Sequence, residues 1–175
     1  ALGQNLLCPF HYFGITDLAV DQKHLSDLSN FQFLTSDERV KHILERAEYF
    51  GYSGSRVKGL IFCSSLDECE DLSKKFNAKG YQTLALSGDN TQDDREKAIE
   101  RLTQERRDSS ALDYILTVDI FNEGVDIPEI NQVLLLRPTQ SPIIFLQQLG
   151  RGLRKADGKD YVIVLDFIAN YKENY

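Results

Sequence analysis

Short hydrophobic runs alternate with longer amphipathic stretches along most of this chain. Runs such as VKGLIFC and YVIVLDF are apolar throughout, which is typical of strands that are buried on both faces of a parallel sheet. The pattern predicts five such strands and one candidate edge strand, at residues 57–63, 81–87, 112–118, 131–137, 161–167 and 11–17 respectively.

The amphipathic stretches between these runs predict helices with recognisable ends. Ser65 and Glu68 have the spacing of a capping box, and the apolar residues after them recur at helical intervals. Gly80 is placed to end that helix, and Pro142 suits the first turn of another. Four helices are expected, and they begin at Thr35, Ser65, Thr91 and Ser141.

Strands of this kind that are separated by helices indicate a doubly wound α/β domain. Such a domain has a mostly parallel sheet with helices on both faces. Residues 55–175 contain the five buried strands and are expected to form this domain. Residues 1–54 hold a lead-in strand, an irregular segment and a helix, which we expect to pack on the domain.

The composition narrows the possible partners and cofactors. The chain has 175 residues and a formal net charge of -7, so any nucleic-acid contact has to come from a local groove rather than from the whole surface. No apolar stretch is long enough to span a membrane. The three cysteines and three histidines form no CxxC, HxH or HxxxH motif. We therefore expect buried free thiols in a reducing cytoplasm and no metal site.

Small, hydroxyl-bearing and acidic residues follow four of the predicted strands. They read CSS at 63–65, SGDNT at 87–91, TVDIFNEGVD at 117–126 and RPTQS at 137–141. Ligands of open α/β sheets bind beyond the carboxyl ends of the strands, and helix starts there suit phosphate oxygens. Each Ser or Thr alone is more commonly a helix cap, but four such loops at one edge predict a ligand-binding rim.

The EGVD segment places a glycine between two carboxylates. Gly124 would allow a ligand to approach the backbone closely, and Asp126 could accept a hydrogen bond from a ribose hydroxyl. On the tetrapeptide alone, a tight turn with solvated acidic side chains is the more common explanation.

Two arginines, Arg151 and Arg154, follow Gly150 and lie three positions apart. At that spacing the two side chains project toward one side of a helix or turn. Guanidinium groups bind phosphate in a bidentate manner, and they can stabilise the charge that develops on a transferring phosphoryl group. The alternative is an exposed basic helix end that the helix dipole favours.

Taken together, these segments resemble the C-terminal RecA-like domain of superfamily 2 helicases and translocases over roughly residues 55–170. GLIFCSS resembles motif IV, and LSGDNTQDDRE, with its Arg95, resembles the stretch that follows the second strand. TVDIFNEGVDIP resembles motif V, and QQLGRGLR matches the QxxGRxxR pattern of motif VI. Within the superfamily, the EGVDIP and QQLGRGLR segments are most similar to those of the type III restriction-enzyme-like and bacterial repair-helicase branch.

The resemblance implies roles for five residues in ATP binding and hydrolysis. Arg154 would be the arginine finger, and Arg151 a second γ-phosphate contact or an interface residue. Gly124 and Asp126 would touch the nucleotide, with Asp126 at the ribose. Gln147 would link the state of the nucleotide to closure between two domains.

The resemblance also implies a surface that contacts the nucleic-acid backbone, here called the nucleic-acid track. DNA is favoured over RNA as the partner. Ser64, Ser87, Gly88 and Thr117 would lie near the nucleic-acid backbone. Contacts of this kind are largely independent of base sequence and sensitive to salt.

The sequence differs from that of a complete helicase in one respect. The sequence contains no GxxxxGK[ST] and no DExx segment that follows a strand in the usual order. We therefore expect ATP with Mg²⁺ to be held by a preceding RecA-like domain of the same polypeptide, which this chain does not contain. The chain alone is expected to be inactive as an ATP hydrolase.

Two other functions remain open on the sequence alone. The first is a non-catalytic α/β module that binds nucleic acid or nucleotide without a catalytic partner. The second is a small Rossmann-like transferase. The transferase would need a glycine-rich turn after its first strand, where this sequence instead has SSLDEC.

Overall fold

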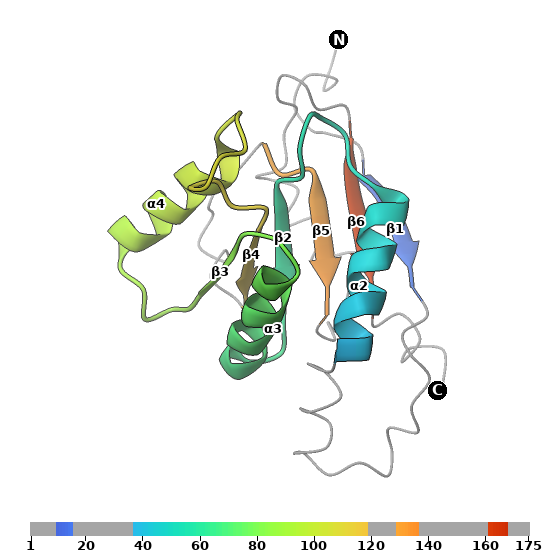
Figure 1. Ribbon diagram of the computed structural model, residues 1–175, viewed down its shortest axis with the longest axis horizontal. Helices are drawn as coiled ribbons and strands as arrows, with labels where there is room; N and C mark the ends of the chain where they lie inside the picture. The colour runs from blue at the N-terminus through green and yellow to red at the C-terminus, as the bar shows by residue number, and fades with distance from the viewer. Residues whose placement is uncertain (1–9, 16–36, 119–128, 137–160, 168–175) are drawn as a thin grey trace.

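A computed structural model describes residues 10–15, 37–118, 129–136 and 161–167 (Figure 1). The predicted strands and helices within these ranges are confirmed, although each strand is shorter than the hydrophobic run that predicted it. The helix expected to begin at Ser141 lies outside the described residues. The elements are β1 (Phe10–Gly14), α2 (Asp37–Phe50), β2 (Gly59–Phe62), α3 (Leu66–Ala78), β3 (Thr83–Leu86), α4 (Gln92–Thr103), β4 (Tyr114–Thr117), β5 (Gln132–Leu135) and β6 (Val162–Asp166).

The strands of the described residues form one parallel sheet of six strands in the order β1-β6-β5-β2-β4-β3. The chain runs from β2 out to β3, returns to place β4 between them, and then adds β5 on the other side of β2. Strand β1 lies at an edge beside β6, as predicted. Because every pairing is parallel, all carboxyl ends lie at one edge of the sheet, which is the lower edge in Figure 1.

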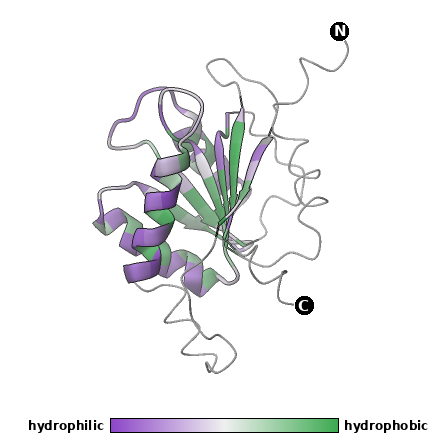
Figure 2. Ribbon diagram, turned by 90° about the vertical axis from the view of Figure 1, so that its right-hand side faces the viewer, coloured by the Kyte–Doolittle hydropathy of each residue, from purple (hydrophilic) through white to green (hydrophobic). Residues whose placement is uncertain are grey.

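Helices α2 and α3 cover one face of the sheet. Ile61 and Leu134 point from the strands into a buried cluster with Ile43 of α2 and Phe76 of α3. Figure 2 shows hydrophobic residues concentrated in the strands and hydrophilic ones on the outward turns of the helices. The amphipathic pattern of each helix therefore decides which of its sides faces the sheet.

Helix α4 packs on the opposite face of the sheet. Its Ala98 and Leu102 join a second buried cluster with Leu60 of β2 and Ile115 of β4. Successive residues of a strand point to opposite faces, so neighbouring positions of β2 enter different clusters. The prediction of a doubly wound sheet with helices on both faces is confirmed.

The ends of α3 and α4 follow the predicted signals, except that Glu68 does not complete the predicted capping box with Ser65 N. Thr91 caps α4, since its hydroxyl accepts a hydrogen bond from Asp94 N at 3.0 Å. The Asp94 carboxylate accepts in turn from Thr91 N at 3.2 Å, which completes a capping box that the sequence did not indicate. Helix α3 ends at Ala78, and Gly80 follows with φ of 100°, a left-handed conformation that favours glycine.

Gly59 begins β2 at a point where the structure leaves no room for a side chain. An added Cβ would overlap the ring of Tyr114 and lie 3.3 Å from the carbonyl oxygen of Gln132. Tyr114 is buried, and its hydroxyl donates to the side chain of Gln132, so the ring has no free direction in which to move.

We expect Gly59→Ala to lower the free energy of unfolding by about 1–3 kcal/mol, the usual effect of overpacking. The midpoint of urea unfolding measures it. Gly88→Ala is the matched control, because its added Cβ meets no atom within 4 Å. Equal midpoints for the two variants would mean that the Tyr114 ring yields to the added methyl group.

Candidate functional site

Strands β2, β4 and β3 end side by side at the carboxyl edge. Thr117, the last residue of β4, is paired with Phe62 of β2 on one side and with Leu86 of β3 on the other. The loops that begin after Phe62 and after Leu86 therefore flank the end of β4. This arrangement brings the four predicted nucleic-acid residues to one edge of the sheet.

The loop after β2 presents Ser64 to solvent. Ser65 caps α3, and its hydroxyl accepts from Glu68 N at 3.1 Å. Ser64 N donates to Glu68 Oε1 at 2.7 Å. The exposed Ser64 hydroxyl has no hydrogen-bond partner within the described ranges, so it is available to a ligand.

The loop after β3 is a tight turn closed by its own side chains. Ser87 N donates to Asn90 Oδ1 at 2.7 Å, and Asp89 N donates to the Ser87 hydroxyl at 3.2 Å. Gly88 is exposed, and its carbonyl accepts from Arg95 Nη2 at 3.2 Å. In the part of the chain that the structure describes, Arg95 Nε is buried without a partner. The turn thus places the Arg95 guanidinium beside Ser87 and Gly88.

Thr117 differs from the other three predicted residues. Its exposed fraction is 0%, and its carbonyl accepts from Cys63 N at 2.9 Å. Thr117 is the last residue of β4, a strand in the interior of the sheet, and its side chain does not reach the surface. Ser64, Ser87 and Gly88 are the accessible members of the group.

The structure adds a buried ion pair that the sequence pattern did not predict. Arg39 Nη1 of α2 lies 3.5 Å from Glu68 Oε2 of α3, and both side chains are 0% exposed. Burial raises the pKa of Glu68, while its hydrogen bond from Ser64 N and the nearby Arg39 act in the opposite direction. One signal was present in the sequence, because Arg39 occupies the same helical stripe as Ile43 and Ala47.

The five residues predicted to contact ATP lie outside the described residues. The strands that precede them, β4 and β5, both end at the carboxyl edge. The sites named from the sequence that the structure does not describe are Gly124, Asp126, Gln147, Arg151 and Arg154.

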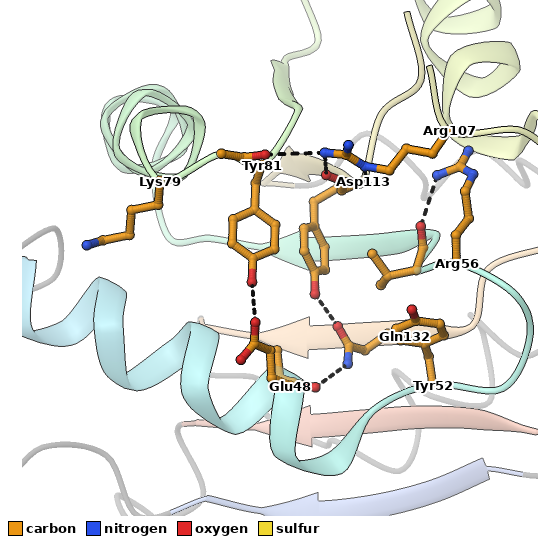
Figure 3. Close-up of a pocket in the computed structure, with 12 residues that line it drawn as sticks. Glu48, Tyr52, Arg56, Lys79, Tyr81, Arg107, Asp113 and Gln132 are labelled. Atoms are coloured by element: carbon orange, nitrogen blue, oxygen red, sulfur yellow. Dashed lines mark hydrogen bonds and ion pairs between the residues drawn. The ribbon is translucent and has the colours of Figure 1, made fainter. Parts of the chain in front are cut away.

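A hollow of about 460 Å³ lies at the opposite, amino edge of the sheet, and Figure 3 shows its walls. Tyr81 donates to Glu48 Oε2 at 3.1 Å, and Arg107 makes two hydrogen bonds of 2.9 and 2.8 Å to the Asp113 carboxylate. Burial, together with the bond to Glu48, raises the pKa of Tyr81 to about 12. Because these polar groups pair with one another, they fasten the starts of the strands together.

Arg56 completes this wall as a buried cation that binds carbonyl groups. Its side chain donates to the carbonyl oxygens of Leu102 at 2.7 Å, Gln104 at 2.9 Å and Leu112 at 3.0 Å. Two of these carbonyls belong to the last turn and C-cap of α4, where the helix dipole favours a cation. Burial lowers the pKa of the Arg56 guanidinium. Arg56 therefore ties α4 to the strand starts.

Two of the remaining predictions concern membrane spans and metal sites. None of the described helices is both long enough and apolar enough to cross a membrane. Within the same residues, no group of three or more His, Cys, Asp or Glu side chains converges to hold a metal ion.

Comparison with known proteins identifies relatives for most of the chain. Residues 33–156 match the family model described as helicase conserved C-terminal domain. The chain is 32% identical over 109 residues to IRC3 of Saccharomyces cerevisiae, a protein described as an ATP-dependent helicase. That match covers 62% of this chain and 15% of IRC3. The chain spans about a third or less of the length of the curated relatives it matches.

Solved structures share the fold. A fragment described as an HsdR subunit of a type I restriction enzyme from Vibrio vulnificus superposes with a TM-score of 0.66 at 17% identity and covers 97% of this chain and 33% of that one. The Type ISP restriction-modification enzyme LlaBIII, bound to DNA, gives 0.60 at 21% identity and covers 91% and 12%. Other relatives, from Methanocaldococcus jannaschii, are described as ATP-dependent RNA helicases. The fold is therefore shared by a protein that is bound to DNA, and the sequence relatives include proteins described as RNA helicases.

Proposed function

Because the chain belongs to the helicase conserved C-terminal domain family, we propose that it is the second motor domain of an ATP-dependent superfamily 2 helicase or translocase. The observation that carries this proposal is the family match over residues 33–156. The sheet supports it, since the loops after β2 and β3 lie at the same edge as the ends of β4 and β5.

In this proposal the chain supplies half of a composite ATP pocket. Arg154 acts as the arginine finger, and Arg151 is a second γ-phosphate contact or an interface residue. Gly124 and Asp126 contact the nucleotide, and Gln147 links its state to domain closure. When bound, ATP with Mg²⁺ supplies the phosphoryl group and the metal charge. It is held mainly by a preceding RecA-like domain of the same polypeptide.

The nucleic-acid track is formed by Ser64, Ser87 and Gly88 at the carboxyl edge. The exposure of Ser64 and Gly88 and the free Ser64 hydroxyl support contacts to phosphate and sugar, which position a strand without reading its sequence. Thr117 is buried, and in this proposal it belongs to the track because it ends the strand that lies between the two loops. We propose DNA as the partner over RNA, and the LlaBIII structure, which is bound to DNA, supports this choice.

The proposed organisation of the chain keeps residues 1–54 as a lead-in and residues 55–175 as the motor domain. Helix α2 packs on the motor domain, because Ile43 and Leu44 lie in the same buried cluster as α3 and the sheet. The proposed location is the cytoplasm.

The isolated chain is expected to release no phosphate from ATP above background, because its sequence contains no P-loop to hold the β- and γ-phosphates. A phosphate-release assay with and without single-stranded DNA and RNA tests this expectation. The full-length protein in the same assay is the control, and there nucleic acid should stimulate turnover. Stimulated hydrolysis by the isolated chain would refute the composite pocket. Binding of nucleic acid without turnover by the full-length protein would favour the non-catalytic module.

A further inference from the structure

We propose that Glu68 is a positioning residue that holds Ser64 in place for nucleic-acid contact, with Arg39 as its buried counter-charge. Helix α2 then contributes the charge that compensates Glu68 in its buried position. This inference rests on the proposed function, since it concerns how that same track is built.

The Glu68 carboxylate connects two separate parts of the chain. Its Oε1 accepts from Ser64 N at 2.7 Å, and its Oε2 lies 3.5 Å from Arg39 Nη1. Ser64 is in the loop after β2, whereas Arg39 is in the first turn of α2. The pair therefore links the loop to a helix that precedes β2 in the chain.

This geometry differs from that of an ordinary capping box. In a capping box the acidic side chain returns to the backbone N–H of the cap residue itself, which in α3 is Ser65. Glu68 instead accepts from the N–H of Ser64, one residue nearer the strand. The Ser65 hydroxyl caps the helix by accepting from Glu68 N. Glu68 thus orients Ser64 and leaves the Ser64 hydroxyl free for a ligand.

The burial of the pair also points to positioning rather than to stability alone. Both side chains are fully buried, so both charges have lost their hydration. Apolar residues of similar size commonly replace such a pair without loss of stability. What an apolar pair cannot supply is an acceptor for the backbone N–H of Ser64. The test therefore separates the effect of losing the hydrogen-bond acceptor from the effect of losing the two charges.

The first experiment compares Arg39→Met/Glu68→Gln with Arg39→Met/Glu68→Met in the full-length protein. Both double variants lose the ion pair, but only the glutamine keeps an acceptor for Ser64 N. Affinity is measured by fluorescence anisotropy with a labelled single-stranded DNA of about 20 nucleotides, longer than the site of one domain. The glutamine variant should bind like the unchanged protein. The methionine variant should bind about fivefold more weakly, the scale of one lost hydrogen bond.

Thermal unfolding of both variants is measured alongside, and equal affinities for two folded variants would overturn the inference. If the methionine variant does not fold, the comparison moves to Glu68→Asp and Glu68→Gln. The aspartate keeps the charge, but its carboxylate is one methylene too short to reach both Ser64 and Arg39. It should weaken binding, whereas the glutamine should not. Unchanged binding by the aspartate variant would equally overturn the inference.

Ser64→Ala separates the failure of this inference from failure of the proposed function. If the unchanged protein does not bind the oligonucleotide, the proposed function fails. If Ser64→Ala weakens binding while both Glu68 double variants bind normally, the track stands and the positioning role fails. In the Ser64→Ala background, the methionine variant should cause no further loss, because Glu68 acts through Ser64. An additive loss would assign the effect to general destabilisation and contradict the inference.

Discussion

Replacing Arg154 by alanine in the full-length protein is expected to lower kcat for nucleic-acid-stimulated ATP hydrolysis by about 10³-fold or more. An arginine finger stabilises the charge that develops on the transferring phosphoryl group, and its loss typically costs this much. Nucleic-acid affinity should change little, because the proposed track uses Ser64, Ser87 and Gly88. Steady-state phosphate release at saturating ATP and nucleic acid measures the effect.

Arg106→Ala is the matched control for Arg154→Ala. Arg106 is an exposed arginine between α4 and β4, away from the carboxyl edge. It should leave kcat and affinity unchanged. If turnover survives in Arg154→Ala, the residue is not the finger. If turnover survives and affinity falls, Arg154 contacts nucleic acid instead.

The second large effect is on stability. Arg56→Met is expected to lower the free energy of unfolding by about 3 kcal/mol. The methionine fills much of the space, but it leaves the carbonyls of Leu102 and Leu112 without their donor, and a buried unpaired carbonyl costs about 1–3 kcal/mol. Arg56 is 6% exposed, so water does not readily replace the guanidinium. Urea unfolding followed by circular dichroism measures the change.

Arg106→Met provides the comparison for Arg56→Met, since it removes the same charge from an exposed position. Its unfolding midpoint should stay close to that of the unchanged protein. A similar midpoint for Arg56→Met would mean that the carbonyl contacts contribute little and that the amino edge is held by other groups.

The hydrophobic pattern predicted the elements well because strand burial and helix periodicity are local properties of the sequence. The run at 57–63 begins before β2 does, and this has a physical reason. Lys58 N donates to Asn131 Oδ1 at 2.8 Å, so a side chain rather than a neighbouring strand satisfies it. Apolar character alone does not distinguish a strand residue from one that flanks it.

The residues at the carboxyl edge were less predictable than the fold. Ser64 and Thr117 both follow or end apolar runs, yet one is exposed and the other fully buried. The difference arises because Thr117 is the last residue of a strand inside the sheet, whereas Ser64 lies in the loop after β2, and the local sequence pattern does not show where each strand ends. The Arg39–Glu68 pair was missed for a similar reason, since it joins residues from two helices that only the folded chain brings together.

The place of β4 has a consequence for how a motor of this kind transmits force. The segment that carries Gly124 and Asp126 continues directly from the strand that separates the two exposed loops. Any force that a bound nucleotide exerts on that segment would act on β4, which is paired with a strand on each side. On the β2 side, Cys63 N donates to Thr117 O. In the proposed function, the segment that contacts the nucleotide and the loops that contact nucleic acid would then be joined directly through β4.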